Sequence, residues 1–359
     1  MKVRVIFAAL AAMAVAACAK SETGPYGNSS QEIVFDAPVV SAATKSAADD
    51  TVFPKDQAFN VYAHYYPELY TAFNEGQPYM QNVTVTYDED KGINGSWTSV
   101  GKQYYWPNQG TLTFAAYSPI SGVGEVTYDE NGFTFKDFVV NDNPEDQIDL
   151  LFSERSYNQT YSNQIDPNPY YYGVQINFLH ALSSIVFKIK TDDMLTGYSF
   201  KVRKIELLNV LNKGTFDQGL PIMGTNQITP APAYDDWNCD HDTRQDYTIL
   251  DTDLIVNSSV PVRVINDRAS DLILIPQALS HDEYNVCVKV IYDYTHSGMA
   301  EGTYITNNES VTPLSTNVVE DWLRGKRYIY TLTLGLNEIR FSPKVETWVT
   351  DSDIQLPTN

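Results

Sequence analysis

The stretch Ile176–Lys190, with the sequence INFLHALSSIVFKIK, decides the fold class. At each of its ends an apolar side chain stands at every second position. Such alternation places apolar side chains on one face of an extended chain and polar ones on the other, as in a half-buried β-strand. The alternating apolar residues are Ile176 and Phe178 at the start and Ile185, Phe187 and Ile189 at the end. The stretch therefore predicts β-structure at both ends.

The same period of two recurs on both sides of this stretch. It is present in NVTVTY (82–87), TLTFAAY (111–117) and YIYTLTLGL (328–336). Turn-forming sequences such as DEDKG, DENG and NKG separate the alternating runs. The only helical candidates are short, around Pro67–Phe73 and Val318–Arg324. Many short strands with such turns predict an all-β protein made of two β-sandwiches in series.

A polar stretch divides the alternating runs into two groups. Ser156–Gly173 contains Pro167 and Pro169 and few apolar residues other than tyrosines. We therefore predict one domain over residues 46–172 and a second over residues 173–359. Another irregular stretch, Gly224–Tyr247, is too long for a tight turn, and we interpret it as an extended surface loop of the second domain.

The N-terminus has the form of an export signal. Lys2 and Arg4 precede an apolar run from Val5 to Ala17, which is too short to span a bilayer. Small residues lead to Cys18, as in a bacterial lipobox, so residues 1–17 are predicted to be a lipoprotein signal peptide and Cys18 the acylated residue. The alternative is an ordinary cleaved signal with an incidental cysteine.

Charge and composition exclude some classes of function. The net charge is −21, and it becomes −23 without Lys2 and Arg4, because 22 basic residues then stand against 45 acidic ones. Such a surface repels phosphate, which argues against nucleic acid as a partner. The hydrophobic fraction of 43% and the 25 tyrosines are typical of a folded core and not of a disordered acidic chain.

The three cysteines do not indicate a disulfide-dependent fold. If Cys18 is acylated, only Cys239 and Cys287 remain, and one bridge between them is conceivable. Cys287 shares a strand face with Lys289, opposite the face of Val286 and Val288, which disfavours the bridge without excluding it.

No pattern in the chain indicates catalysis or metal binding. The cluster NCDHD (238–242) lacks the paired spacing of a zinc site, and the remaining histidines are scattered. G-x-S-x-G, H-E-x-x-H and Gly-rich phosphate loops are absent from the sequence. Tyr170–Tyr172 would suit a sugar-stacking platform, but packing at a domain seam is the commoner role of such a run. We expect no enzyme activity, no cofactor and no metal site.

Four stretches together resemble the fimbrillin family, the subunits of type V pili of Gram-negative anaerobes. They are YYWPNQGTLTFAAYSP (104–119), EDQIDLLFSE (145–154), INFLHALSSIVFKIK (176–190) and WLRGKRYIYTLTLGLNEIRFSPKVETW (322–348). The resemblance implies two tandem Greek-key, transthyretin-like β-sandwich domains. It also implies a route in which a lipoprotein precursor reaches the outer membrane and a trypsin-like protease removes its first strand. A strand from another subunit then fills the groove.

The resemblance assigns roles to particular residues at both ends of this chain. Residues 18–45 correspond to a pro-segment, whose removable strand QEIVFDAPVV places Ile33, Phe35 and Ala37 on one face.

Lys45 is the only basic residue between Lys20 and Lys55, so it is the candidate cleavage site. The family's best-known subunits are cut after arginine, and none occurs between Arg4 and Arg155. Two explanations are consistent with the missing arginine: the protease accepts lysine, or the chain is never cut. The C-terminal donor-strand candidates are Val349, Ile354 and Leu356.

The expected function is thus a structural subunit of a cell-surface fimbria that supports adhesion, anchored first in the outer membrane by its lipid. Its expected partners are other pilin subunits and the processing protease. Two alternatives stay open. One is an uncut anchor or a tip subunit, the latter binding host glycan or protein through its distal loops. The other is a surface lipoprotein that keeps its first strand and binds glycan as a monomer.

Overall fold

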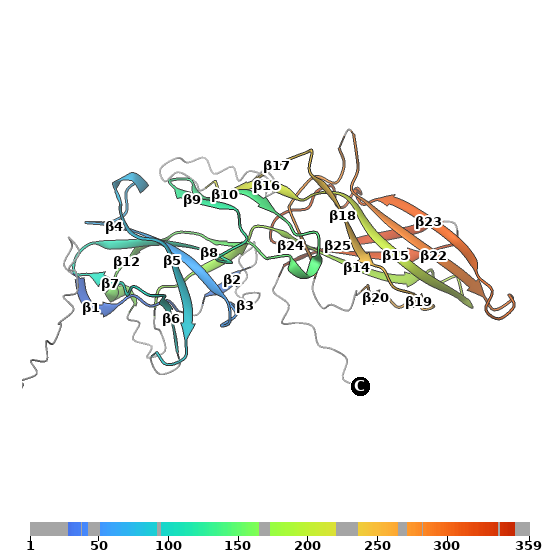
Figure 1. The fold of residues 1–359 in the computed structure, drawn as a ribbon, viewed down its shortest axis with the longest axis horizontal. Coiled ribbons are helices and arrows are strands. Elements are labelled where there is room, and N and C mark those ends of the chain that lie inside the picture. Colours follow the sequence, from blue (N-terminus) through green and yellow to red (C-terminus); the bar gives the residue numbers. More distant parts are fainter. Residues whose placement is uncertain are drawn as a thin grey trace, which may run out of the picture.

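A computed structural model describes residues 28–36, 38–41, 51–91, 95–164, 173–219, 236–264, 271–281, 283–336 and 338–348. The chain forms an elongated body in which two β-rich halves follow one another along the long axis (Figure 1). Within the described ranges every regular element is a strand or a short 3₁₀ turn. The all-β prediction is confirmed.

The N-terminal half is built around a nine-stranded sheet, counted over the described residues, in the order β3-β2-β13-β11-β8-β4-β5-β6, with β12 paired to β8. Its strands are β2 (Val39–Ser41), β3 (Thr51–Val52), β4 (Ala58–Tyr66), β5 (Gln77–Asp88), β6 (Ser96–Ser99), β8 (Thr111–Ser118), β11 (Leu151–Ser153), β12 (Ser156–Gln159) and β13 (Asn177–His180). A separate pair joins β1 (Asn28–Glu32) to β7 (Tyr105–Pro107). β13 follows residue 172 and is hydrogen-bonded into this sheet; the domain limits given above stay a prediction.

A smaller sheet packs against one face of the first one. Its order is β17-β16-β10-β9. The strands are β9 (Glu125–Asp129), β10 (Gly132–Val139), β16 (Lys213–Asp217) and β17 (Trp237–Cys239). Tyr117 of β8 packs against Phe133 and Phe135 of β10, with ring centroids 5.6 and 5.5 Å apart. All of β8 is therefore buried, and the prediction of a half-buried strand at 111–117 was wrong there, because a second layer covers its other face.

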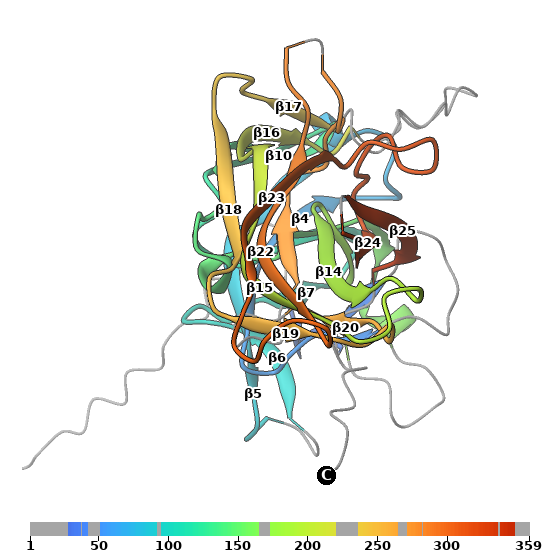
Figure 2. The same cartoon turned by 90° about the vertical axis from the view of Figure 1, so that its right-hand side faces the viewer.

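The C-terminal half is a sandwich of two sheets, each with five strands in the described part of the chain. One has the order β20-β14-β24-β25, with β21 also on β14; the other has β18-β15-β22-β23, with β19 also on β15. The view along the long axis shows the two sheets facing each other (Figure 2). The strands are β14 (Ser183–Thr191), β15 (Tyr198–Leu211), β18 (Arg244–Leu250), β19 (Leu254–Val256), β20 (Val262–Arg263), β21 (Leu272–Leu274), β22 (Cys287–His296), β23 (Ile305–Pro313), β24 (Lys326–Leu334) and β25 (Ile339–Thr347).

Three expectations about individual segments were wrong. The described end of Gly224–Tyr247 forms β17 and the start of β18, because Trp237 pairs with Phe216 and Tyr247 is buried in the sandwich. Val318–Arg324 is not a helix but an irregular segment with bends and a turn: Trp322 and Gln277 exchange backbone hydrogen bonds of 2.9 and 3.1 Å, in place of the bonds that a helix would make. The candidate at Pro67–Phe73 is replaced by a 3₁₀ turn at Phe73–Glu75.

Candidate functional site

The candidate site is the place where the chain's N-terminal segment, defined here as residues 31–41, is inserted into the first half. Ile33 and Phe35 are each only 1% exposed, and Val40 is equally well buried. Ala37, the third residue expected on that face, lies outside the described residues.

Backbone hydrogen bonds hold the N-terminal segment along both of its edges. On one edge the Ile33 amide donates to the Tyr104 carbonyl at 2.8 Å, and the Phe35 amide donates to the Trp97 carbonyl at 3.0 Å. On the other edge Val174 donates to the Val34 carbonyl at 2.9 Å and accepts from Asp36 at 3.1 Å. The segment runs antiparallel to the first neighbour and parallel to the second.

An aromatic pocket receives Phe35. Its ring lies edge-to-face against Phe59 and Phe114, with centroids 5.7 and 5.8 Å apart. Phe53 and Trp97 extend the cluster, with their own centroids 5.5 Å apart. Burial of a phenylalanine side chain contributes about 1.5–3 kcal/mol, and each aromatic pair adds about 0.5–1.5 kcal/mol. Phe35 is therefore the main apolar anchor of the N-terminal segment.

The alternation of buried residues shifts by one position within the segment. After Ile33 and Phe35 the buried side chains are Pro38 and Val40, so odd positions give way to even ones. From here β2 runs parallel to β13 and antiparallel to β3. β2 is the only strand that β3 pairs with among the described residues, and the Phe53 amide donates to the Pro38 carbonyl at 2.8 Å. Among the described residues, strand β3 therefore depends on the N-terminal segment for its backbone pairing.

Gly173 permits the close approach of the two backbones. Its φ is +145°, and a Cβ atom there would lie 2.4 Å from the carbonyl carbon of Phe35 and 2.5 Å from the amide nitrogen of Asp36. Any side chain would push the segment away. Sequence reasoning missed this residue, although a glycine immediately before an alternating run is a usable sign of close backbone contact.

The other residues singled out from sequence are placed as follows. Cys18, Lys45, Val349, Ile354 and Leu356 lie outside the described residues. Cys239 and Cys287 are both free thiols. Burial raises the pKa of the Cys239 thiol to about 11, so this side chain is not a reactive thiolate at neutral pH.

A cluster around Arg155 was also missed. Arg155 is 7% exposed, and its Nε donates to the Tyr128 hydroxyl at 2.8 Å and its Nη1 to the Tyr70 hydroxyl at 3.3 Å. The guanidinium also lies 4.9 Å from the centre of the Phe73 ring. Burial, and secondarily Arg155, lowers the pKa of nearby His64 to about 4. The cluster joins the β4–β5 connection to β9. A single arginine forms no recognisable sequence motif, so the sequence did not indicate this cluster.

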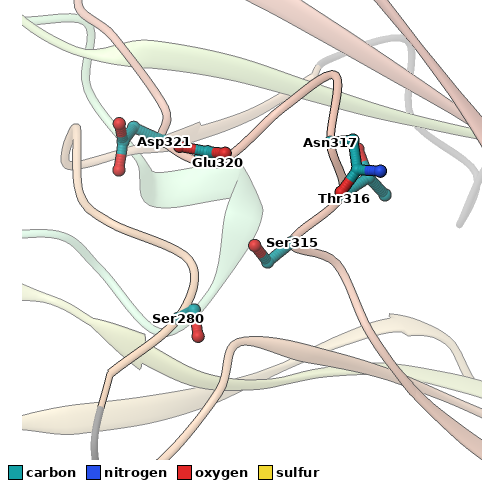
Figure 3. Close-up of a pocket in the computed structure, with 6 residues that line it drawn as sticks. All are labelled: Ser280, Ser315, Thr316, Asn317, Glu320 and Asp321. Atoms are coloured by element: carbon teal, nitrogen blue, oxygen red, sulfur yellow. The ribbon is translucent and has the colours of Figure 1, made fainter.

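The described surface also has a polar pocket of about 390 Å³ in the second half (Figure 3). Its lining consists of hydroxyls, an amide and two carboxylates: Ser280, Ser315, Thr316, Asn317, Glu320 and Asp321. On the adjoining loop the Tyr284 ring stacks on His281 at 4.4 Å, and the Arg244 guanidinium lies 4.2 Å from its centre. Both contacts use the Tyr284 ring, so it is not available to stack on a ligand. The pocket lining itself consists of hydrogen-bonding groups and contains no aromatic side chain.

The described residues contain neither a cluster of metal ligands nor a helix that could span a membrane. No three His, Cys, Asp or Glu residues of that part of the chain are grouped so as to hold a metal ion. None of its helices is long and apolar enough to cross a membrane.

Comparison with known proteins gives a family match. A family model described as fimbrillin-like matches residues 42–348. A crystal structure of a fimbrial protein from Bacteroides vulgatus shares 18% identity and superposes with a TM-score of 0.59, covering 89% of this chain and 99% of that one. It shares the fold.

More distant structures include one from Bacteroides uniformis, provisionally described as a cell adhesion protein, with 18% identity and a TM-score of 0.48 over 88% of this chain and 99% of that one. The C-terminally truncated tip fimbrial protein Mfa3 from Porphyromonas gingivalis has 9% identity and a TM-score of 0.40 over 88% and 100% of the two chains. No curated protein sequence gives a significant match.

Proposed function

The chain belongs to the fimbrillin-like family, and we propose that it is a structural, non-enzymatic subunit of a cell-surface fimbria assembled by exchange of β-strands. One observation carries the proposal. The N-terminal segment is bonded along both edges and buries Ile33 and Phe35, while the link to the body passes through residues 42–50. A single cut in that link would divide the chain between an inserted strand and its binding site.

Loss of the segment would leave a site that favours another strand. The carbonyls of Tyr104 and Trp97 and both backbone groups of Val174 would lose their partners, and the pocket of Phe35 would be open to water. Buried backbone groups without partners destabilise a fold, and open sheet edges with apolar pockets bind extended peptides. A strand from a second subunit would restore both kinds of contact.

The chemistry of the chain ends fits such a route. Cys18 would hold the precursor at the outer membrane by its acyl chains, and a trypsin-like protease would cut after Lys45 and release residues 18–45. The donated strand would come from the C-terminus, with Val349, Ile354 and Leu356 as its apolar residues. Ile354 and Leu356 have the same spacing as Ile33 and Phe35. The two domains over residues 46–172 and 173–359 are part of this proposal.

The test is to follow the precursor through limited trypsin treatment. Intact mass and N-terminal sequencing are expected to show loss of residues 18–45, and electron microscopy and SDS gels are expected to show fibres or SDS-resistant ladders. Lys45→Gln should block both. Lys55→Gln is the matched control, because Lys55 is exposed on the other side of the link and should leave cleavage and assembly unchanged. A Lys45→Gln chain that polymerises normally, or a cut chain that stays monomeric, contradicts the proposal.

The polar pocket favours one alternative, a glycan-binding lipoprotein. Hydroxyl, amide and carboxylate groups such as Ser315, Asn317 and Glu320 are the hydrogen-bonding groups that sugars use in proteins. This alternative predicts that the uncut monomer binds oligosaccharides on a glycan array and that Asn317→Ala abolishes binding. An uncut chain that binds no glycan but caps growing fibres would instead be an anchor or tip subunit.

A further inference from the structure

The last described residue at the C-terminal end, Trp348, is held by a ring stack. Its indole lies on the imidazole of His180 with ring centroids 3.9 Å apart and planes 13° apart. Trp348 is 6% exposed although it directly follows β25 and precedes residues 349–359. This position in the chain makes the stack the base of the C-terminal segment.

His180 is itself fixed in place. Its Nδ1 lies 3.0 Å from Oδ1 of Asp149, and its side chain is fully buried. Its Nε2 has no hydrogen-bond partner within the described chain, so the ring is held by one carboxylate and by the indole face. The imidazole therefore offers Trp348 a flat surface whose orientation Asp149 sets.

The backbone around the stack joins both halves of the protein. The Trp348 amide donates to the Gly325 carbonyl at 3.1 Å, and the Gly325 amide donates to the Leu182 carbonyl at 2.8 Å. Ala181, next to His180, donates to the Leu150 carbonyl at 2.8 Å. Trp348 is thus connected through two hydrogen bonds and one ring stack to the segment that leads from β13 to β14.

The stack also lies beside the candidate site. His180 ends β13, whose residues Asn177–Leu179 run parallel to Val39–Ser41 of the N-terminal segment. Trp348, the last described residue, accordingly lies at the end of the strand that pairs with the N-terminal segment.

We infer that the Trp348–His180 stack, oriented by Asp149, is a positioning anchor that sets where and in which direction residues 349–359 leave the subunit for donation to a second copy of this chain. The inference rests on the proposed strand exchange. Fixing the base of a donated segment lowers the conformational entropy lost when the segment binds, so the anchor should speed donation. It should not affect acceptance, because Trp348 belongs to the other core cluster and not to the one that contains Phe35.

The experiment separates donation from acceptance with full-length chains. A fluorescently labelled Lys45→Gln chain keeps its N-terminal segment, so it can donate but not accept; unlabelled, trypsin-cut chains are the acceptors. Incorporation of label into SDS-resistant species measures donation. Trp348→Ala in the labelled chain should slow incorporation by about three- to tenfold, the range set by one lost aromatic pair. The same substitution in the unlabelled acceptor should leave incorporation of the Trp348-containing donor unchanged.

Two further variants complete the design. Asp149→Asn alters a carboxylate that is partly exposed, so the chain should fold, and donation should slow by a smaller factor in the same direction. Tyr284→Ala is the matched control, because it removes another stacked pair, with His281, on a loop of the second half and should leave donation unchanged.

The outcomes are distinct. Normal donation by both the Trp348 and Asp149 variants, or an equal loss in the donor and acceptor roles, overturns the anchor. Absence of any label transfer from the Lys45→Gln donor with Trp348 intact would instead refute strand exchange itself.

Discussion

The N-terminal segment and strand β25 lie near opposite ends of the chain, and they are held in different ways. The segment is bonded along both edges, and its main side chains enter a pocket. β25 pairs only with β24 among the described residues, over nine aligned residue pairs, and Val345 on it is 43% exposed. Removal of the segment would leave a gap with two walls, whereas removal of β25 would leave one open edge. If strand exchange occurs as proposed, this difference favours the N-terminal segment over β25 as the strand that is replaced.

The largest expected effect comes from the apolar anchor of the N-terminal segment. Phe35→Ala in the uncut chain should lower the free energy of unfolding by about 3–5 kcal/mol, because it leaves a cavity among aromatic rings. The corresponding substitution on β25 is Phe341→Ala. The Phe341 ring is partly buried, with its centroid 6.1 Å from that of Tyr330, so a loss of about 1 kcal/mol in the free energy of unfolding is expected. Urea denaturation followed by tryptophan fluorescence measures both. Equal losses would remove the distinction between the two regions.

The next effect concerns the close approach at Gly173. Gly173→Ala should destabilise the uncut chain by about 2–3 kcal/mol, because the new Cβ would overlap the backbone of Phe35. Gly302→Ala is the control: it also has a positive φ, but no atom lies within 4 Å of its Cβ position, so only the backbone strain of about 1 kcal/mol applies. After cleavage and release of the segment, the excess loss at Gly173 should disappear. Its persistence would show that the contact with Phe35 is not the cause.

A smaller effect depends on pH and lies outside the N-terminal segment. Burial holds the pKa of His64 in the folded chain at about 4, below its ordinary value of 6.5, so the unfolded chain takes up the proton first as the pH falls. The stabilisation is complete above pH 6.5 and is lost as the pH decreases towards 4, by on the order of 1–2 kcal/mol.

The variant His64→Gln should flatten that part of the stability profile, and it should do so equally before and after cleavage, because His64 packs against Phe73 and Tyr128 and not against the segment. Denaturation at pH 7 and pH 4.5 measures the change. A profile that His64→Gln leaves unaltered would assign the pH dependence to other groups.

The smallest effect is expected on the exposed side of β25. Val345→Thr should change the free energy of unfolding by less than about 0.5 kcal/mol, since the side chain is largely in solvent and threonine keeps the β-branched shape. Thermal melting is sufficient to measure it. A loss above 1 kcal/mol would indicate that a partner surface covers β25 in solution.

Much of the fold could be read from the period of two. Ile185, Phe187 and Ile189 of β14 are buried as their alternation predicts, with Lys188 and Lys190 partly exposed. The prediction failed where a second layer covers a strand, as on β8, because burial of the other face depends on residues from β10, distant in sequence.

The site was predictable in part. Ile33 and Phe35 carry the alternation that drew attention to the segment, and both are buried. The shift in alternation before Pro38 had no local signature, since it depends on pairing with β13, far away in the chain. The glycine before the alternating run at 174–178 indicated a close backbone contact at Gly173, but not that Phe35 would be its partner. The same holds for the buried Arg155, whose partners Tyr70 and Tyr128 come from the β4–β5 connection and from β9.

The sequence by itself determined that this chain is all-β, acidic and related to fimbrillins, because side-chain period, charge and motif order are local properties. Only the tertiary structure decided which residues meet: Phe35 between Trp97 and Val174, and Trp348 on His180. These contacts join segments separated by dozens of residues or more, and their stability comes from burial and hydrogen bonds that exist only once the sheets have packed.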